Sequence, residues 1–255
     1  MMRGCKLGIC LMVILCWTSG AIGATNADSE QRKPLTREDM LRMNLSSAYM
    51  LMRTDATAEE DFEAGKLAME RMEVVEAQGL FERAGKKGHT GAMVIFGDIV
   101  YRAGFVEDAR ASYRMAAELG DPQAQYNLGT MYMDISNYDW KDLNSKVRPI
   151  EARKWILMAA EQGYKDAVNV IALAYAEGGL GLTDAERTDA EVLKWLRKSA
   201  EAGNGLSRDA LSKAYRDGKY GLTVDTALAD EWAAKAREAY GIKEKEKIQK
   251  RKKRL

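Results

Sequence analysis

The sequence predicts an all-α protein, a right-handed α-solenoid of stacked antiparallel helix pairs. Three observations predict this fold class. Only 3 of the 255 residues are prolines, which interrupt helices, and only 4 are phenylalanines. Runs of valine and isoleucine, which favour strands, are scarce. A pattern of small residues and glycine also recurs along the chain, and such recurrence is typical of repeat architectures.

The recurring pattern is clearest in three segments that each contain an Ala-Glu pair and end with glycine: Met115–Gly120, Met158–Gly163 and Lys198–Gly203. A small residue follows each glycine by four positions, and Arg83–Gly88 fits the same register. The small residues that open the four units are Ala92, Ala124, Ala167 and Ser207. A second small residue stands five positions later in every unit. Agreement at so many fixed offsets predicts one structural unit repeated along the chain.

Each unit is predicted to be a pair of helices. Small residues on the first helix let a neighbouring helix approach closely, and apolar residues four and eight positions after the first small residue form a buried stripe. In the second helix, Ala152, Trp155 and Ala159 recur at helical spacing. Glycine is expected to end this helix because it adopts the left-handed cap conformation without strain. One pair cannot bury both of its apolar faces, so the pairs are expected to stack.

These units resemble the Sel1-like repeat, a relative of the tetratricopeptide repeat. The resemblance is carried by Ala124–Tyr132 with Glu151–Trp155 and Ala159–Gly163, and by Ala167–Tyr175 with Glu191–Gly203. Most members of the family are adaptors and scaffolds. The resemblance therefore implies a helical solenoid that binds other proteins.

The resemblance covers about residues 60–241, with departures at two places. In the first full unit, Ser112-Tyr113 stands in the second helix where later units have tryptophan. Trp232 stands nine residues before Gly241 instead of eight. Residues 60–241 are predicted to form the solenoid.

A concave surface follows from the comparison with tetratricopeptide arrays. There the first helices expose the positions two, six, nine and ten residues after the first small residue. In this chain those positions hold charges, amides and tyrosines, which suit an extended peptide or a partner helix. The predicted partner-binding residues are Asp98, Tyr101, Arg102, Tyr126, Thr130, Asn169 and Lys213.

A long connection between two helices, residues 133–149, provides a second candidate surface. Insertions in repeat arrays map to one edge, which often binds partners. Tyr138 and Trp140 are predicted partner contacts because aromatic side chains dominate interface hot spots. The alternative is that Trp140 folds back onto the helices.

Residues 1–23 have the pattern of a secretory signal peptide. Arg3 and Lys6 precede an apolar run, Leu7–Trp17, and small residues precede the expected cleavage before Ala24. The alternative is an uncleaved anchor, for which the run is shorter than the roughly 20 apolar residues that span a bilayer. A periplasmic or secreted location is expected. All three cysteines lie in this segment, which excludes disulfides, thiol catalysis and cysteine-bound zinc from the mature chain.

Two regions lie between the signal and the repeats. Residues 24–34 are polar and are predicted to be a disordered linker. Residues 35–59 are predicted to form an N-terminal capping helix that begins at Thr36 and covers the open core of the first repeat. A methionine-rich partner groove is the alternative role for this helix. Asn44-Leu45-Ser46 matches a glycosylation sequon, which leaves an adaptor of a eukaryotic secretory lumen open.

The C-terminal tail, residues 242–255, contains eight basic and two acidic residues. It is interpreted as a solvated extension of the last helix, where cations are favourable. An anionic membrane surface or an acidic partner is the alternative. Nucleic acid is not expected as a partner, because no stacking aromatic residues accompany the charge.

No catalytic constellation, cofactor site or metal site is predicted. The only histidine, His89, lies between repeats and is interpreted as a capping or solvated residue. Glu59-Glu60-Asp61 are interpreted as charges at a helix start. The sequence therefore predicts a non-catalytic scaffold of the cell envelope that binds a peptide or a partner helix. The alternative is a peptidoglycan- or β-lactam-related binding protein or hydrolase, an activity linked to some secreted Sel1-like proteins that have disulfide-bonded hairpins.

Overall fold

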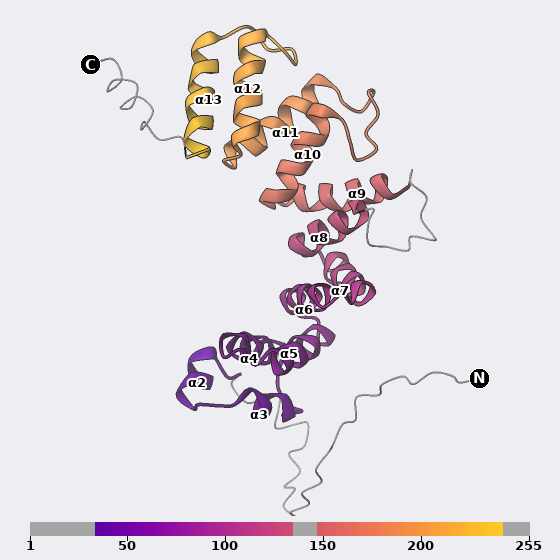
Figure 1. Cartoon of the computed structure of the whole chain (residues 1–255), viewed down its shortest axis with the longest axis vertical. Helices are drawn as coiled ribbons and strands as arrows, with labels where there is room; N and C mark the ends of the chain where they lie inside the picture. Colours follow the sequence, from indigo (N-terminus) through magenta and orange to yellow (C-terminus); the bar gives the residue numbers. More distant parts are fainter. Residues whose placement is uncertain (1–33, 135–146, 242–255) are drawn as a thin grey trace, which may run out of the picture. The chain divides into compact units, whose positions relative to one another are not determined.

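The computed structural model describes residues 34–134 and 147–241, and these residues form helices without any strand (Figure 1). The described helices belong to one compact unit that begins at Leu35. Ten of them form five successive pairs: α4 (Ala58–Glu70) with α5 (Val74–Lys86), α6 (Thr90–Arg102) with α7 (Val106–Glu118), α8 (Pro122–Met133) with α9 (Val147–Glu161), α10 (Lys165–Glu177) with α11 (Asp189–Glu201), and α12 (Gly205–Asp217) with α13 (Thr226–Ala239). Each helix packs on its pair partner, and the second helix of each pair packs on the first helix of the next pair. The predicted all-α solenoid of stacked helix pairs is confirmed.

The turns between pairs form where the glycine pattern predicts them. Gly120 has a φ of 93°, and its backbone N–H and that of Asp121 donate to carbonyls in the last turn of α7. Asp121 then begins α8, because its carboxylate accepts a hydrogen bond of 2.9 Å from the Ala124 N–H. Gly88, Gly163 and Gly203 also have positive φ at the ends of second helices. A glycine stop followed directly by the start of the next helix turns the chain sharply.

The core lies where helices approach closely at small residues. Ala92, Ala124 and Ala167 are fully buried. At Gly97 an added Cβ would lie 2.6 Å from the Tyr113 ring, and at Gly65 it would lie 2.7 Å from the Phe81 ring. Tyr113, which departs from the repeat pattern in sequence, thus fills the space above the glycine of its own pair.

The N-terminal cap differs from the single helix expected over residues 35–59. It consists of two short helices, α2 (Arg37–Arg42) and α3 (Ser47–Met52). Thr36 begins the first of them as predicted, and it forms a capping box with Asp39 at the start of α2. Asn44, with a φ of 48°, ends α2, and Ser46 caps α3. The expected continuous helix is wrong because these two residues favour a stop and a new start over continuation.

We predict that the glycine contact in the middle of the array is required for stability. In Gly129→Ala the new Cβ would collide with the Ile156 side chain and would lie 3.1 Å from the Ala152 carbonyl oxygen. Helix α9 must then move, and the free energy of unfolding should fall by about 1–3 kcal/mol in urea denaturation.

The matched control is Gly91→Ala in α6, where the nearest atom would be 3.3 Å away on the His89 ring, so that only a small shift is needed. Its stability should be unchanged or slightly higher, because alanine favours a helix over glycine. Equal losses in both variants would contradict close approach at Gly129.

Candidate functional site

The first helices of four successive pairs are α6, α8, α10 and α12, and their exposed sides are together called the first-helix face. A cavity of about 470 Å³ lies between α6 and α8 on this face. The structure brings four predicted residues together there: Asp98, Tyr101 and Arg102 from α6, and Thr130 from α8. The remaining lining comes from Tyr113, Asn127, Met131 and Asp134.

The polar groups of this cavity differ in how firmly they are held. The Asp98 carboxylate accepts hydrogen bonds from the Tyr113 hydroxyl at 2.5 Å and from the Asn127 amide at 3.4 Å. Arg102 is exposed, and within residues 34–134 and 147–241 its guanidinium has neither an ion-pair nor a hydrogen-bond partner. The cavity therefore has a fixed carboxylate and a cation that is available to a ligand.

A second cavity, of about 360 Å³, lies between α10 and α12 and includes the predicted Asn169 and Lys213. Asn169 is held by the Ser199 hydroxyl, which donates to its amide oxygen at 2.7 Å. Leu173 and Leu206 also line the cavity and are 48% and 66% exposed. This cavity thus combines apolar surface with one cation, Lys213, and two carboxylates, Glu177 and Asp209.

Tyr126 lies outside the linings of both cavities. Its ring packs against Tyr164, with 5.3 Å between the ring centroids. Burial, and then the nearby Asp166 carboxylate, raise the pKa of both tyrosines. Val94, at the equivalent position on α6, is buried. This position therefore contributes to packing between pairs as well as to the surface.

The predicted site residues and the residues of the cavities do not coincide fully. Tyr138 and Trp140, the predicted contacts in the insertion, lie outside the described residues. Asn127 and Leu206 line the cavities but were not predicted, because they occupy offsets that the tetratricopeptide comparison does not include. For Asn127, the sequence did contain a signal, namely a polar amide next to the predicted buried stripe.

The connection between α10 and α11 is held by its own charged residues. Arg187 donates to the carbonyls of Tyr175 and Ala176 at 3.0 and 2.9 Å. Hydrogen bonds from the Thr183 backbone and hydroxyl, and then the contact with Arg153, lower the pKa of Glu186 to about 2. Glu186 therefore stays ionised from neutral pH down to strongly acidic pH.

His89 has the structural role expected of it. Its Nδ1 accepts a hydrogen bond of 3.1 Å from the Ala92 N–H at the start of α6, and its ring stacks on Phe62 at 4.0 Å. Over the described part of the chain, no group of three or more His, Cys, Asp or Glu side chains is placed to hold a metal ion.

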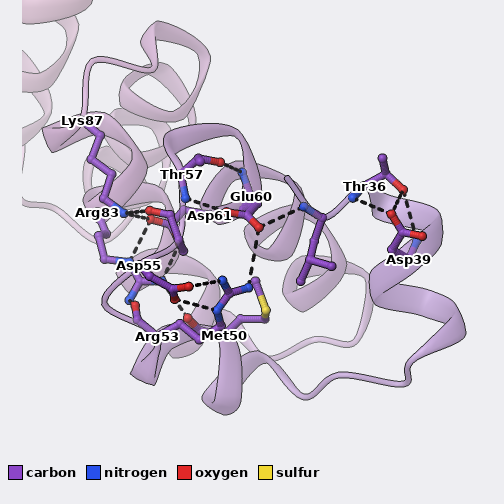
Figure 2. A network of polar contacts seen from close by, with 12 residues as sticks. Thr36, Asp39, Met50, Arg53, Asp55, Thr57, Glu60, Asp61, Arg83 and Lys87 are labelled. Atoms are coloured by element: carbon purple, nitrogen blue, oxygen red, sulfur yellow. Dashed lines mark hydrogen bonds and ion pairs between the residues drawn. The ribbon is translucent and has the colours of Figure 1, made fainter. Parts of the chain in front are cut away.

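A network of polar contacts lies between the cap and the first pair, α4 and α5 (Figure 2). Asp61 is fully buried, and its carboxylate pairs with Arg83 at 2.5 Å and with Lys87 at 2.7 Å. The same two cations reach the backbone of the cap. Arg83 donates to the Met50 and Arg53 carbonyls at 2.7 and 2.9 Å, and Lys87 donates to that of Ala56.

Glu60 completes this cluster from the same turn of α4. Its carboxylate accepts hydrogen bonds from the Thr57 N–H at 2.7 Å and from the Leu35 N–H at 2.9 Å. The expected helix-start role is thus only part of its function, because Glu60 also fixes the beginning of the cap. Because the charged groups of this cluster bind backbone of the same chain, we interpret the cluster as part of the fold and not as a binding site.

Comparisons with known proteins identify the fold. No protein-family model matches the sequence. The chain is 36% identical over 98 residues to an F-box protein of Arabidopsis thaliana, a match that spans 38% of this chain and only 25% of the plant protein. A solved Sel1 repeat protein from Oxalobacter formigenes is 22% identical and covers 80% of this chain and 77% of its own, with a TM-score of 0.57. The chain has the Sel1-repeat fold.

A second Sel1-type structure is similar to this chain. It is a protective antigen of uropathogenic Escherichia coli with an SLR fold, 24% identical, with a TM-score of 0.46 over 80% of this chain and 49% of its own. The structure from Oxalobacter formigenes confirms the predicted resemblance to Sel1-like repeats at the level of the fold.

We predict that the buried cluster stabilises the cap of this Sel1-repeat array. Asp61→Ala leaves Arg83 and Lys87 without their shared carboxylate, and the free energy of unfolding should fall by about 3–5 kcal/mol. Limited proteolysis near residues 53–57 should become faster. The control is Glu82→Ala, which removes an exposed pair with Lys86 and should cost less than about 1 kcal/mol. Similar losses in the two variants would contradict the role of Asp61.

Proposed function

We propose that the protein is a non-catalytic interaction scaffold that binds an extended peptide or a partner helix along its first-helix face. The Sel1-repeat fold is of the protein-interaction type. The observation that carries the proposal is the presence of two cavities on this one face, between α6 and α8 and between α10 and α12.

The two cavities favour different parts of such a partner. The α6–α8 cavity presents the available guanidinium of Arg102, which suits a carboxylate, and the carboxylates of Asp98 and Asp134, which suit backbone N–H groups of a peptide. The α10–α12 cavity presents Leu173 and Leu206, which suit an apolar side chain, and Lys213, whose ammonium group suits an acidic residue next to that side chain. A peptide with an acidic residue and, further along, an apolar anchor fits both.

We also propose that the protein acts after export, in an envelope or an extracellular compartment. The support is the signal-peptide pattern of residues 1–23. Across the described residues, every helix is too short or too polar to cross a bilayer. The F-box description belongs to the plant protein and supports no partner for this chain.

Charge reversal on the first-helix face tests the proposed binding site. Peptides selected from a random display library on the purified protein are measured for affinity by fluorescence anisotropy. Arg102→Glu and Lys213→Glu should each weaken binding at least tenfold, about 1.4 kcal/mol, because each replaces a favourable charge contact with a repulsive one.

Lys194→Glu on α11 is the matched control, because Lys194 is 58% exposed, pairs with Glu191 and lines neither cavity. It should bind like the wild-type chain, and circular dichroism should show that all three variants keep their helices. If the two face variants bind like the wild-type chain, the site lies elsewhere, whatever Lys194→Glu does.

A further inference from the structure

The turn between α2 and α3 contains Asn44-Leu45-Ser46, the only Asn-x-Ser/Thr triplet among the 255 residues. Asn44 has a φ of 48°, and its backbone N–H donates to the Leu41 carbonyl at 3.1 Å. The Leu45 N–H donates to the Met40 carbonyl at 3.2 Å, which completes the stop signal of α2. The backbone of the turn is therefore satisfied without the Asn44 side chain.

The Asn44 side chain is exposed and available. Within the described residues its amide has no hydrogen-bond partner. The turn itself is anchored from the other side, because Arg71 donates to the Leu45 carbonyl at 2.8 Å. A bulky group on the Asn44 amide can thus extend into solvent without displacing the cap from α4.

Ser46 has a structural role that leaves its proton free. Its hydroxyl oxygen accepts a hydrogen bond of 3.1 Å from the Tyr49 N–H and so caps α3. The triplet therefore combines two local roles, a left-handed stop at Asn44 and a cap at Ser46, and neither role requires this pair of residue types. Glycine serves the first position better, and aspartate serves the second equally well.

The surface around the triplet is unusually apolar for the end of a repeat array. Leu41 and Met43 are 51% and 57% exposed, and Tyr49 and Met52 on α3 are 53% and 82% exposed. A terminal cap normally needs a polar outer face to keep the array soluble. An attached oligosaccharide at Asn44, next to Met43, would supply that polar cover.

We infer that Asn44 is a site of N-linked glycosylation. In the transfer, the Asn44 amide nitrogen forms a bond to C1 of the first sugar of a lipid-diphosphate-linked oligosaccharide. The bond between C1 and the phosphate oxygen breaks, the lipid diphosphate leaves with the electron pair, and the amide proton passes to a base of the transferase. The inference rests on the export part of the proposed function, since the donor is used on exported chains.

The full chain is expressed in a eukaryotic cell in two forms, one with residues 1–23 and one with a proven secretory signal in their place. The lumenal location of each is measured by protection from protease. Lumenal chain should migrate with one step of added mass, and peptide N-glycosidase should remove that step and leave an aspartate at position 44, which mass spectrometry identifies.

Three variants separate glycosylation from the local roles of the turn. Asn44→Gly keeps the left-handed stop, and Ser46→Asp keeps the cap of α3, yet both destroy the triplet, so the added mass should be lost completely. Ser46→Thr keeps both the triplet and the cap, so the added mass should remain.

The outcomes distinguish this inference from the export proposal. If only the form with the proven signal is lumenal and glycosylated, the native signal has failed and the site stands. A protease-protected lumenal chain without the added mass, in both the wild type and Ser46→Thr, would overturn the inference.

Discussion

Close approach of helices at small residues is the constraint on which this structure depends. Gly97 leaves room only for the Tyr113 ring, and Ala124 and Ala167 are fully buried between neighbouring helices. Because each pair covers the apolar flank of the next, the stack has no other way to bury its core. The same stacking places α6, α8, α10 and α12 in succession, so that the cavities form between alternate helices.

Repeat periodicity made the pairs and their glycine turns predictable, since both depend on residues close in sequence. The cap was predicted less well. In the sequence, Asn44 and Ser46 are compatible with polar positions on one helix. Only the backbone geometry shows that α2 ends at Asn44 and that α3 begins after Ser46. The burial of Asp61 could not be predicted. It depends on Arg83, which also binds the Met50 carbonyl of the cap, and no sequence pattern pairs these residues with Asp61. Four predicted site residues share one cavity, whereas the packing of Tyr126 against Tyr164 required the structure.

Polar side chains have different roles in two regions of the chain, the cap and the first-helix face. At the cap, buried charges bind backbone of the same chain and fix the first pair, which protects the end of the array. On the first-helix face, Arg102 and Lys213 are left available beside cavities, which is where a partner can gain from them. The inferred glycan lies on the cap, and no residue of its turn lines either cavity, so glycosylation and partner binding can act independently.

Native-state hydrogen exchange on a chain shortened to end at Gly203 tests the dependence on stacking most directly, because the truncation removes the last pair, α12 and α13, and the tail, while residues 1–203 stay. If neighbouring pairs supply the stability, α10 and α11 should exchange much faster than in the full chain, and α4 and α5 should keep their protection. Unchanged protection of α10 and α11 would show that each pair is stable alone and would contradict this explanation of the fold.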